Sequence, residues 1–143
     1  MKALPTILIV EDMDDDVFFL KRALLRAGIV NPLQVAVDGQ QALNYLSGTG
    51  VHADRTAHPL PFLILLDMKL PYVMGLDVLK WIRRHPELNA TAVAVLSSSQ
   101  QENDVNDVLA EGGDAYLVKP ATPEKLTRLM EAIREGRKAV VDL

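Results

Sequence analysis

The sequence has no cysteine among its 143 residues. Disulfides, thiolate metal sites and cysteine nucleophiles are therefore excluded. Long apolar runs are missing too, because stretches such as 6–10 and 62–66 fall far short of the roughly 20 residues that a membrane helix needs. The first run ends in acids and not at a small-residue cleavage site, so we expect no signal peptide, no membrane partner and a cytoplasmic location.

Basic residues are outnumbered by acidic ones, which gives a formal net charge of −4. A nucleic-acid-binding surface needs clustered Lys and Arg to neutralise phosphates, so no nucleic-acid partner is expected. A hydrophobic share of 49% with 24% charged residues is typical of a folded domain. The length suits a single domain over 1–143, with a core from about 6 to 136 and an apolar tail at 137–143.

Short apolar runs alternate with amphipathic stretches along the chain. The runs predict five strands, at 6–10, 33–37, 62–66, 92–96 and 115–118. Helical spacing predicts a helix after each strand, and on the first helix one core-facing side is expected to hold Phe19, Leu20, Ala23, Leu24 and Ala27. Five strand–helix units in strict alternation predict an α/β fold with a parallel sheet. The weakly alternating run 33–37 suits an edge strand, and the aperiodic segment 47–61 is predicted to be a loop.

Polar residues follow four of the five predicted strands. Glu11 and Asp12 end the first strand, Asp67 the third, Ser97 the fourth and Lys119 the fifth. Ligands of open α/β sheets bind outside the carboxyl ends of the strands. The sequence therefore predicts three carboxylates, a hydroxyl and an ammonium along one edge of the sheet.

Three neighbouring carboxylates repel one another unless a cation joins them. Mg²⁺ suits this role, because it is held by one or two carboxylates together with water and phosphate oxygens. A phosphoryl group beside that ion needs a second positive partner and a hydrogen-bond donor, which Lys119 and Ser97 supply. The pattern predicts a Mg²⁺-assisted phosphoryl-transfer site with a carboxylate as acceptor.

Each of these residues also has a purely structural interpretation. Glu11 and Asp12 alone fit the start of a helix, where acidic side chains interact favourably with the helix dipole. Asp67 alone fits the start of a turn, Ser97 fits a helix cap, and Lys119 can simply end a strand. The combination of all five at one edge favours the common site.

Four segments resemble a known family, and they stand at 7–12 (ILIVED), 38–43 (DGQQAL), 65–71 (LLDMKLP) and 116–120 (YLVKP). Together they are similar to the response-regulator receiver domains of two-component signalling, from residue 6 to about 134. The segment before the third strand resembles the subgroup that includes cyanobacterial phytochrome-associated regulators. The resemblance implies a flavodoxin-like, doubly wound (βα)5 fold with five parallel strands in the order 2-1-3-4-5.

The resemblance also assigns roles at the metal side of the site. Asp67 stands at the position of the family's phospho-accepting aspartate. Asp12 matches the direct Mg²⁺ ligand, and Glu11 matches the acid that usually acts through a water. Lys69 matches the residue that gives the metal its main-chain carbonyl. The implied metal set is therefore Glu11, Asp12, Asp67 and the Lys69 carbonyl.

Three further residues match the family's switch and its lysine. Ser97 stands where a hydroxyl bonds the phosphoryl group, and Lys119 stands where a lysine neutralises it. Tyr116 matches the aromatic residue that changes rotamer on phosphorylation. The resemblance also implies a cis peptide bond between Lys119 and Pro120.

The implied function is that of a stand-alone response regulator in a phosphorelay. It takes a phosphoryl group from a sensor histidine kinase, catalyses only its own phosphorylation and dephosphorylation, and presents a switched surface to a downstream protein. Two alternatives stay open, a non-phosphorylated pseudo-receiver adaptor and an intermediate relay or phosphate sink. A dehalogenase-type phosphatase is disfavoured, because its second acid would stand where Lys69 does.

On the first predicted helix, Phe18 and Leu25 are predicted to point away from the core of the domain, with Lys21 and Arg22 beside them. We interpret the pair as a docking stripe for a kinase helix, the alternative being that they pack under the C-terminal tail.

The tail 139–143 is apolar and has two interpretations. It folds back on its own domain or covers a second copy, and homodimerisation is supported by Val140, which continues the line of Leu126 and Ile133. His52, Asp54 and His58 are interpreted as members of a flexible, solvated loop and not as metal ligands, because spacings in a proline-rich loop fix no geometry.

Overall fold

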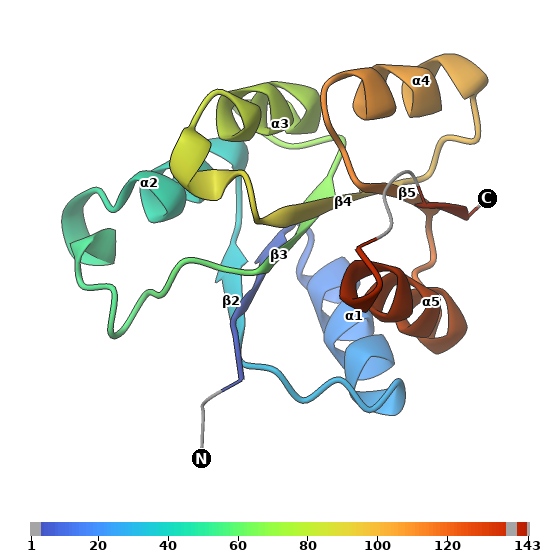
Figure 1. Cartoon of the computed structure of the whole chain (residues 1–143), viewed down its shortest axis with the longest axis horizontal. Helices are drawn as coiled ribbons and strands as arrows, with labels where there is room; N and C mark the ends of the chain where they lie inside the picture. Colours follow the sequence, from blue (N-terminus) through green and yellow to red (C-terminus); the bar gives the residue numbers. More distant parts are fainter. Residues whose placement is uncertain (1–3, 137–139, 143) are drawn as a thin grey trace.

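A six-stranded parallel sheet lies between two layers of helices (Figure 1). The computed structural model describes residues 4–136 and 140–142. Its strands are β1 (Ile7–Val10), β2 (Leu33–Ala36), β3 (Leu63–Asp67), β4 (Ala92–Ser97), β5 (Ala115–Val118) and β6 (Val140–Asp142). Its helices are α1 (Asp14–Arg26), α2 (Gly39–Ser47), α3 (Gly75–Arg83), α4 (Glu102–Ala110) and α5 (Pro123–Arg134), with 3-10 turns η1 (Gly50–Ala53) and η2 (Pro86–Leu88).

The strands stand in the order β2-β1-β3-β4-β5-β6, and every neighbouring pair is parallel. The first five strands confirm the expected order, and β2 is an edge strand as predicted. The sixth strand was not predicted. It places Val140 opposite Ala115 and Val141 opposite Tyr116, so this part of the tail folds back on its own chain. Ala139 and Leu143 lie outside the described residues.

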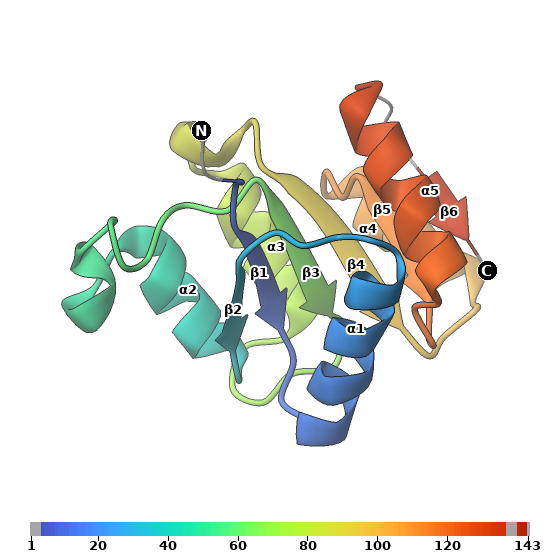
Figure 2. The ribbon, with the colours of Figure 1, turned by 90° about the horizontal axis from the view of Figure 1, so that it is seen from below.

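The helices divide between the two faces of the sheet (Figure 2). Helices α1 and α5 cover one face, where Ile7, Ile9 and Leu65 belong to one core cluster. Helices α2, α3 and α4 cover the other face, where Leu8 and Ile64 belong to a second cluster. Helices cover the central strands β1 and β3 on both faces, which explains why β1 is apolar at every position and β3 at every position before Asp67.

The prediction for helix α1 was wrong at one position. Leu20, Ala23 and Leu24 are buried as expected, but Phe19 is 59% exposed. Successive helical residues are about 100° apart, so the arc toward the sheet is too narrow to include Phe19 beside Leu20. Its ring packs edge-to-face against Phe18, with ring centroids 5.5 Å apart.

The segment after α2 is more ordered than the predicted loop. Arg55 donates hydrogen bonds to the main-chain oxygens of Tyr45, Leu46 and His58. The ring of Tyr45 contacts those of His52 and His58, and the Nδ1 atoms of both histidines are buried without a hydrogen-bond partner. The expected flexible, solvated loop is therefore wrong for these two side chains.

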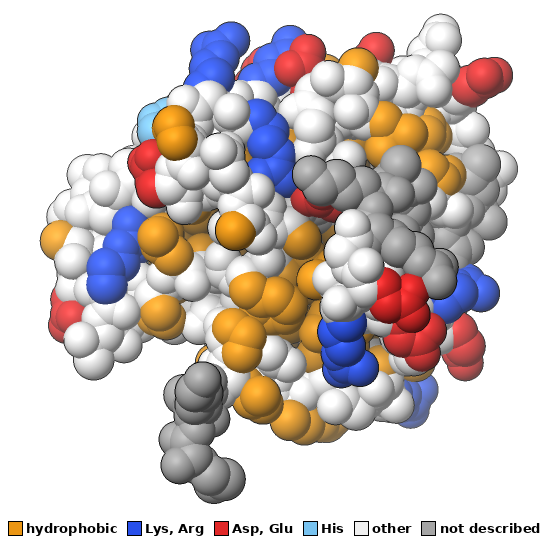
Figure 3. Space-filling model, in the orientation of Figure 1, with side chains coloured by type: hydrophobic (Ala, Val, Ile, Leu, Met, Phe, Trp, Pro, Cys, Tyr) orange, Lys and Arg blue, Asp and Glu red, His pale blue; other side chains and the backbone are white. Residues whose placement is uncertain are grey.

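On the face drawn in Figure 3, hydrophobic side chains gather in the lower middle, over the segment that joins α1 to β2. Val30 of that segment is 66% exposed. The segment lies at the amino ends of the strands, opposite the edge at which Glu11 and Asp67 stand. None of the helices in the described part of the chain has the length and apolar character needed to cross a membrane.

Candidate functional site

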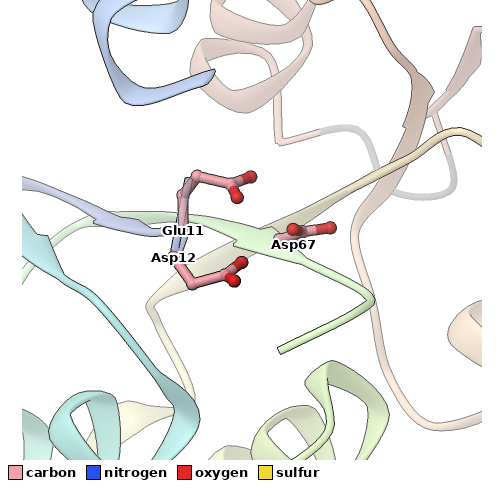
Figure 4. A group of neighbouring side chains, drawn as sticks. All are labelled: Glu11, Asp12 and Asp67. Carbon is pink, nitrogen blue, oxygen red and sulfur yellow. The ribbon is translucent and has the colours of Figure 1, made fainter. Parts of the chain in front are cut away.

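Two adjacent central strands bring the acidic residues together. Strands β1 and β3 pair in parallel with Val10 opposite Leu66, so Glu11 and Asp67 come next on each strand at the same edge. Figure 4 shows Glu11 and Asp12 just beyond the end of β1 and Asp67 at the end of β3. The sheet register alone therefore places carboxylates that are far apart in the sequence side by side.

Glu11, Asp12 and Asp67 each offer a carboxylate oxygen, and these oxygens lie within 4.8 Å of one another. Glu11 and Asp67 are only 3% and 6% exposed. Within the described residues, this is the one group of three or more ligating side chains that could hold a metal ion. An all-oxygen donor set of this kind fits a hard divalent cation such as Mg²⁺.

Lys119 supplies the positive charge of the site. Its Nζ lies 3.0 Å from Oε2 of Glu11, 3.2 Å from Oδ2 of Asp16 and 3.4 Å from Oδ2 of Asp67. Its main-chain N–H donates to the Ser97 carbonyl, which ties the end of β5 to the end of β4. The peptide bond between Lys119 and Pro120 is cis, as the resemblance to receiver domains implied.

The buried charges change the acidity of two groups. The pKa of Glu11 is raised from its ordinary 4.5 to about 7, mainly by burial and in smaller part by the neighbouring Asp67, while hydrogen bonds from Lys119 and the Met13 N–H oppose the rise. Burial alone lowers the pKa of Lys119, but the hydrogen bond to Glu11 and the charge of Asp67 outweigh it and the pKa rises. The site therefore holds its lysine charged and favours the uncharged form of Glu11 more than water does.

The backbone around Asp67 is closely packed against α3. The Lys69 N–H donates to Oδ1 of Asp67 at 3.3 Å, which leaves Oδ2 on the side of Lys119. A Cβ atom on Gly75 would lie 2.2 Å from the Asp67 carbonyl oxygen. Glycine is therefore required at the start of α3 for the helix to approach the strand this closely.

Ser97 and Tyr116 are joined through one residue that the sequence did not single out. The Ser99 N–H donates to Oγ of Ser97 at 3.0 Å, and the Tyr116 hydroxyl donates to the Ser99 carbonyl at 2.8 Å. Tyr116 is fully buried in this arrangement. The segment 97–99 thus connects the hydroxyl near Asp67 to the aromatic ring on β5.

A groove of about 570 Å³ opens beside the site, between α1 and the segment that joins β5 to α5. Phe19, Arg22 and Arg26 of α1 line it together with Lys119 and Pro123. Phe18 and Leu25 lie on the same helix and are 60% and 67% exposed, as predicted. The groove therefore borders the charged site, and of these exposed apolar residues of α1 only Phe19 lines it.

The family model described as "Response regulator receiver domain" matches residues 7–131. The chain belongs to the response regulator receiver domain family. The strand order 2-1-3-4-5 within the sheet and the structural neighbours together confirm the flavodoxin-like receiver fold. Membership also implies interaction with a histidine kinase as phosphodonor.

Several named proteins are similar to this receiver domain over most of their length. The probable methanogenesis regulatory protein FilR2 of Methanothrix harundinacea is 36% identical over 90% of this chain and 81% of its own. The bacteriophytochrome response regulator RtBRR is 38% identical, with a TM-score of 0.81 over 91% of this chain and 78% of its own. The phosphorylated cyanobacterial phytochrome response regulator RcpA is 32% identical, with a TM-score of 0.77 over 93% of both chains. The expected likeness to phytochrome-associated regulators is confirmed.

Receiver domains bind Mg²⁺ or Mn²⁺ at an acidic pocket, which in this chain corresponds to Glu11, Asp12 and Asp67. A solved structure of the regulator Rcp1 is a Mn²⁺-bound form, and it is 31% identical, with a TM-score of 0.74 over 92% of both chains. Rcp1 comes from Synechocystis.

Sequence reasoning missed one charged member of the site, Asp16. It stands in a run with Asp14 and Asp15 in the first turn of α1, where an acid is favourable through the helix dipole alone. No spacing rule distinguishes them, because only the packing of α1 against the end of β5 decides which of the three reaches Lys119.

Proposed function

We propose that this receiver domain accepts a phosphoryl group on Asp67 from a histidine kinase, and that Mg²⁺ binds at Glu11, Asp12, Asp67 and the Lys69 carbonyl. One observation carries the proposal: the carboxylate of Asp67 lies within 4.8 Å of two other acids and 3.4 Å from an ammonium. A buried carboxylate beside an ammonium and a group of oxygens that fits a divalent cation is placed to act as a nucleophile toward a phosphoryl group.

In the transfer step, a carboxylate oxygen of Asp67 attacks the phosphorus of a phosphohistidine. The new P–O bond forms as the P–N bond breaks, and the leaving imidazole keeps the electron pair and takes up a proton. Mg²⁺, when bound, supplies charge compensation for the phosphoryl oxygens. Lys119 supplies positive charge to the same phosphoryl oxygens, because its Nζ already lies 3.4 Å from Oδ2 of Asp67.

The switch would begin at Ser97. Its Oγ accepts a hydrogen bond from the Ser99 N–H and has its own hydrogen to donate, so a phosphoryl oxygen on Asp67 would draw it inward. A shift of Ser99 would also move Tyr116, because the Tyr116 hydroxyl donates a hydrogen bond to the Ser99 carbonyl. A charge added at Asp67 is thereby converted into a change on the β4–β5 side of the domain, where a downstream protein could bind.

We also propose that the kinase docks one of its helices on α1. The exposed Phe18 and Leu25 offer apolar contacts, and Phe19 adds a third within the groove. Arg22 and Arg26 line the same groove, so acidic residues on the kinase helix would complement it. Docking there would bring the donor histidine to the edge at which Asp67 stands.

Acetyl phosphate with Mg²⁺ tests the phosphoacceptor directly, because it supplies the phosphoryl group without a kinase. Intact-mass measurement should show one added phosphoryl group on the wild-type chain and none on Asp67→Asn. Beryllofluoride with Mg²⁺ should perturb the NMR signals around Ser97 and Tyr116 in the wild type alone. An unmodified wild-type chain in both experiments would favour the pseudo-receiver adaptor, and onward transfer from Asp67 to a histidine of a second protein would favour the relay.

A further inference from the structure

The ammonium of Lys119 lies within 3.4 Å of three carboxylates. Glu11 at 3.0 Å and Asp16 at 3.2 Å accept hydrogen bonds from Nζ, and Asp67 lies 3.4 Å away. The three acids come from three different elements: the end of β1, the first turn of α1 and the end of β3. Nζ is therefore held from three directions and not by a single flexible pair.

Asp16 differs from the other two acids because it is not one of the possible metal ligands and because its side chain is more exposed. Glu11 and Asp67 belong to the group of oxygens that could hold a metal ion, and Asp16 does not. Its side chain is 46% exposed, whereas those of Glu11 and Asp67 are 3% and 9% exposed. Asp16 is thus the partner of Lys119 that stays available when the buried acids face a cation and a phosphoryl group.

We propose that Asp16 is a positioning residue that holds the Lys119 ammonium in place for phosphoryl transfer to Asp67. The proposal rests on the proposed phosphoacceptor function of Asp67. With Asp16 accepting one N–H of the ammonium, another N–H can donate to a phosphoryl oxygen on Asp67 while Nζ stays where it is. The reacting groups then need little rearrangement during the transfer.

This contact has little weight in the stability of the fold. An ion pair with one partner almost half exposed contributes little to the free energy of unfolding, because water screens the two charges. The position of an ammonium beside a reacting phosphoryl group counts for more, because misplacement of a charge by about 1 Å lowers a rate strongly. The effect of losing Asp16 should therefore be seen in the rate and not in the melting temperature.

The neighbouring aspartate provides a matched control. Asp15 is exposed, lies in the same first turn of α1 and carries the same charge. Replacing it changes the interaction with the helix dipole and the net charge just as replacing Asp16 does. No hydrogen bond or ion pair between Asp15 and Lys119 is present among the described contacts. Only the variant at Asp16 removes a partner of Nζ.

The experiment compares wild type, Asp15→Ala, Asp16→Ala and Asp16→Glu in their rate of labelling by acetyl phosphate. Saturating Mg²⁺ and about 0.5 M salt are used, because salt screens the long-range effect of a lost charge. We expect Asp16→Ala to be about three- to tenfold slower than Asp15→Ala, and Asp16→Glu to recover at least half of the lost rate. Rates of Asp16→Ala and Asp15→Ala within about twofold of each other would overturn the proposal.

Mg²⁺ affinity, measured by calorimetry without a phosphodonor, separates positioning from metal binding. Asp16→Ala should bind Mg²⁺ within about twofold of Asp15→Ala, because Asp16 is not a member of the acidic group. A loss of about tenfold or more would make Asp16 part of the metal site and would overturn its role as a positioning residue. A wild-type chain that is not labelled at Asp67 would instead refute the proposed function itself.

Discussion

Glu11 is almost completely buried, yet it is an acid with two other acids as neighbours. Its pKa of about 7, against an ordinary 4.5, means that the folded chain binds a proton there more tightly than the unfolded chain does. The stabilisation from this proton is present at low pH. It is lost as the pH rises from about 4.5 to about 7, because the unfolded chain releases the proton first.

Without metal, the free energy of unfolding of the wild type should therefore fall with rising pH relative to that of Glu11→Gln. The difference between the two proteins should change by up to about 3 kcal/mol between about pH 4.5 and about pH 8. Urea unfolding in the presence of EDTA measures it. Glu87→Gln is the control, because Glu87 is exposed on η2 and should leave the pH dependence of the wild type unchanged. Parallel curves for the wild type and Glu11→Gln would contradict the prediction.

The candidate site illustrates what residue patterns can and cannot predict. Glu11, Asp12 and Asp67 could be grouped from the sequence because each directly follows or ends an apolar strand, and parallel strands share a carboxyl edge. Asp16 and Ser99 could not be found in this way. Asp16 contacts Lys119 and Ser99 contacts Tyr116, each across two different elements. Such contacts depend on the packing of those elements, which the periodicity of the sequence does not predict.

The segment after α2 differs most from its prediction, because the sequence indicated an irregular loop and the structure shows an ordered segment. Its structure depends on one side chain: the Arg55 guanidinium donates to the main-chain oxygens of Tyr45 and Leu46, the end of α2, at 2.7 and 2.8 Å. The Tyr45 hydroxyl in turn donates to the Pro59 carbonyl. Aperiodic composition is typical of a loop, but it does not reveal that a guanidinium satisfies the last carbonyls of the preceding helix.

Arg55→Ala should lower the free energy of unfolding by about 1.5–3 kcal/mol, because it leaves several main-chain oxygens without their charged donor. Hydrogen exchange of the amides in 48–61 should speed up more than that of the central strands. Arg55→Lys keeps the charge but not the planar fork of donors, and should recover less than half of the loss. Arg84→Ala, an exposed arginine after α3, serves as the control. Unchanged exchange in 48–61 of Arg55→Ala would contradict this account.

Elements were predicted best where burial imposes a pattern on every residue. The central strands β1 and β3 are apolar throughout because helices coat both faces, and their ranges were found to within a residue. Residues at the edge of a helix's buried side follow no such strict pattern, which is why Phe19 is predicted in the core but is exposed. Strand β6 was missed because three residues of an edge strand carry too little pattern to distinguish them from an apolar tail.

At the scale of the whole molecule, α1 lines the groove beside the acidic edge and exposes Phe18 and Leu25 to solvent. The double variant Phe18→Ala, Leu25→Ala should slow phosphoryl transfer from a histidine kinase by about tenfold or more, because two apolar contacts of the docked helix are lost. The kinase to use is the one that labels the wild type fastest at equal concentration. Labelling by acetyl phosphate should stay within about twofold of the wild type.

Val30→Ala is the matched control for this surface. Val30 is as exposed as Leu25, but it lies beyond α1 in the segment that leads to β2. Transfer from the kinase to Val30→Ala should therefore proceed at the wild-type rate. A double variant that is phosphorylated as fast as Val30→Ala would show that the kinase does not use the exposed side of α1.

The strand order has a consequence for how the chain is made. Synthesis runs from the amino terminus, and β1 and β3 are both complete long before β5 leaves the ribosome. The three acids of the pocket can therefore gather on a nascent sheet that has no Lys119 to offset their charge. During that interval a proton or a dissolved cation is the partner available to these acids, until β5 brings Lys119 to the same edge.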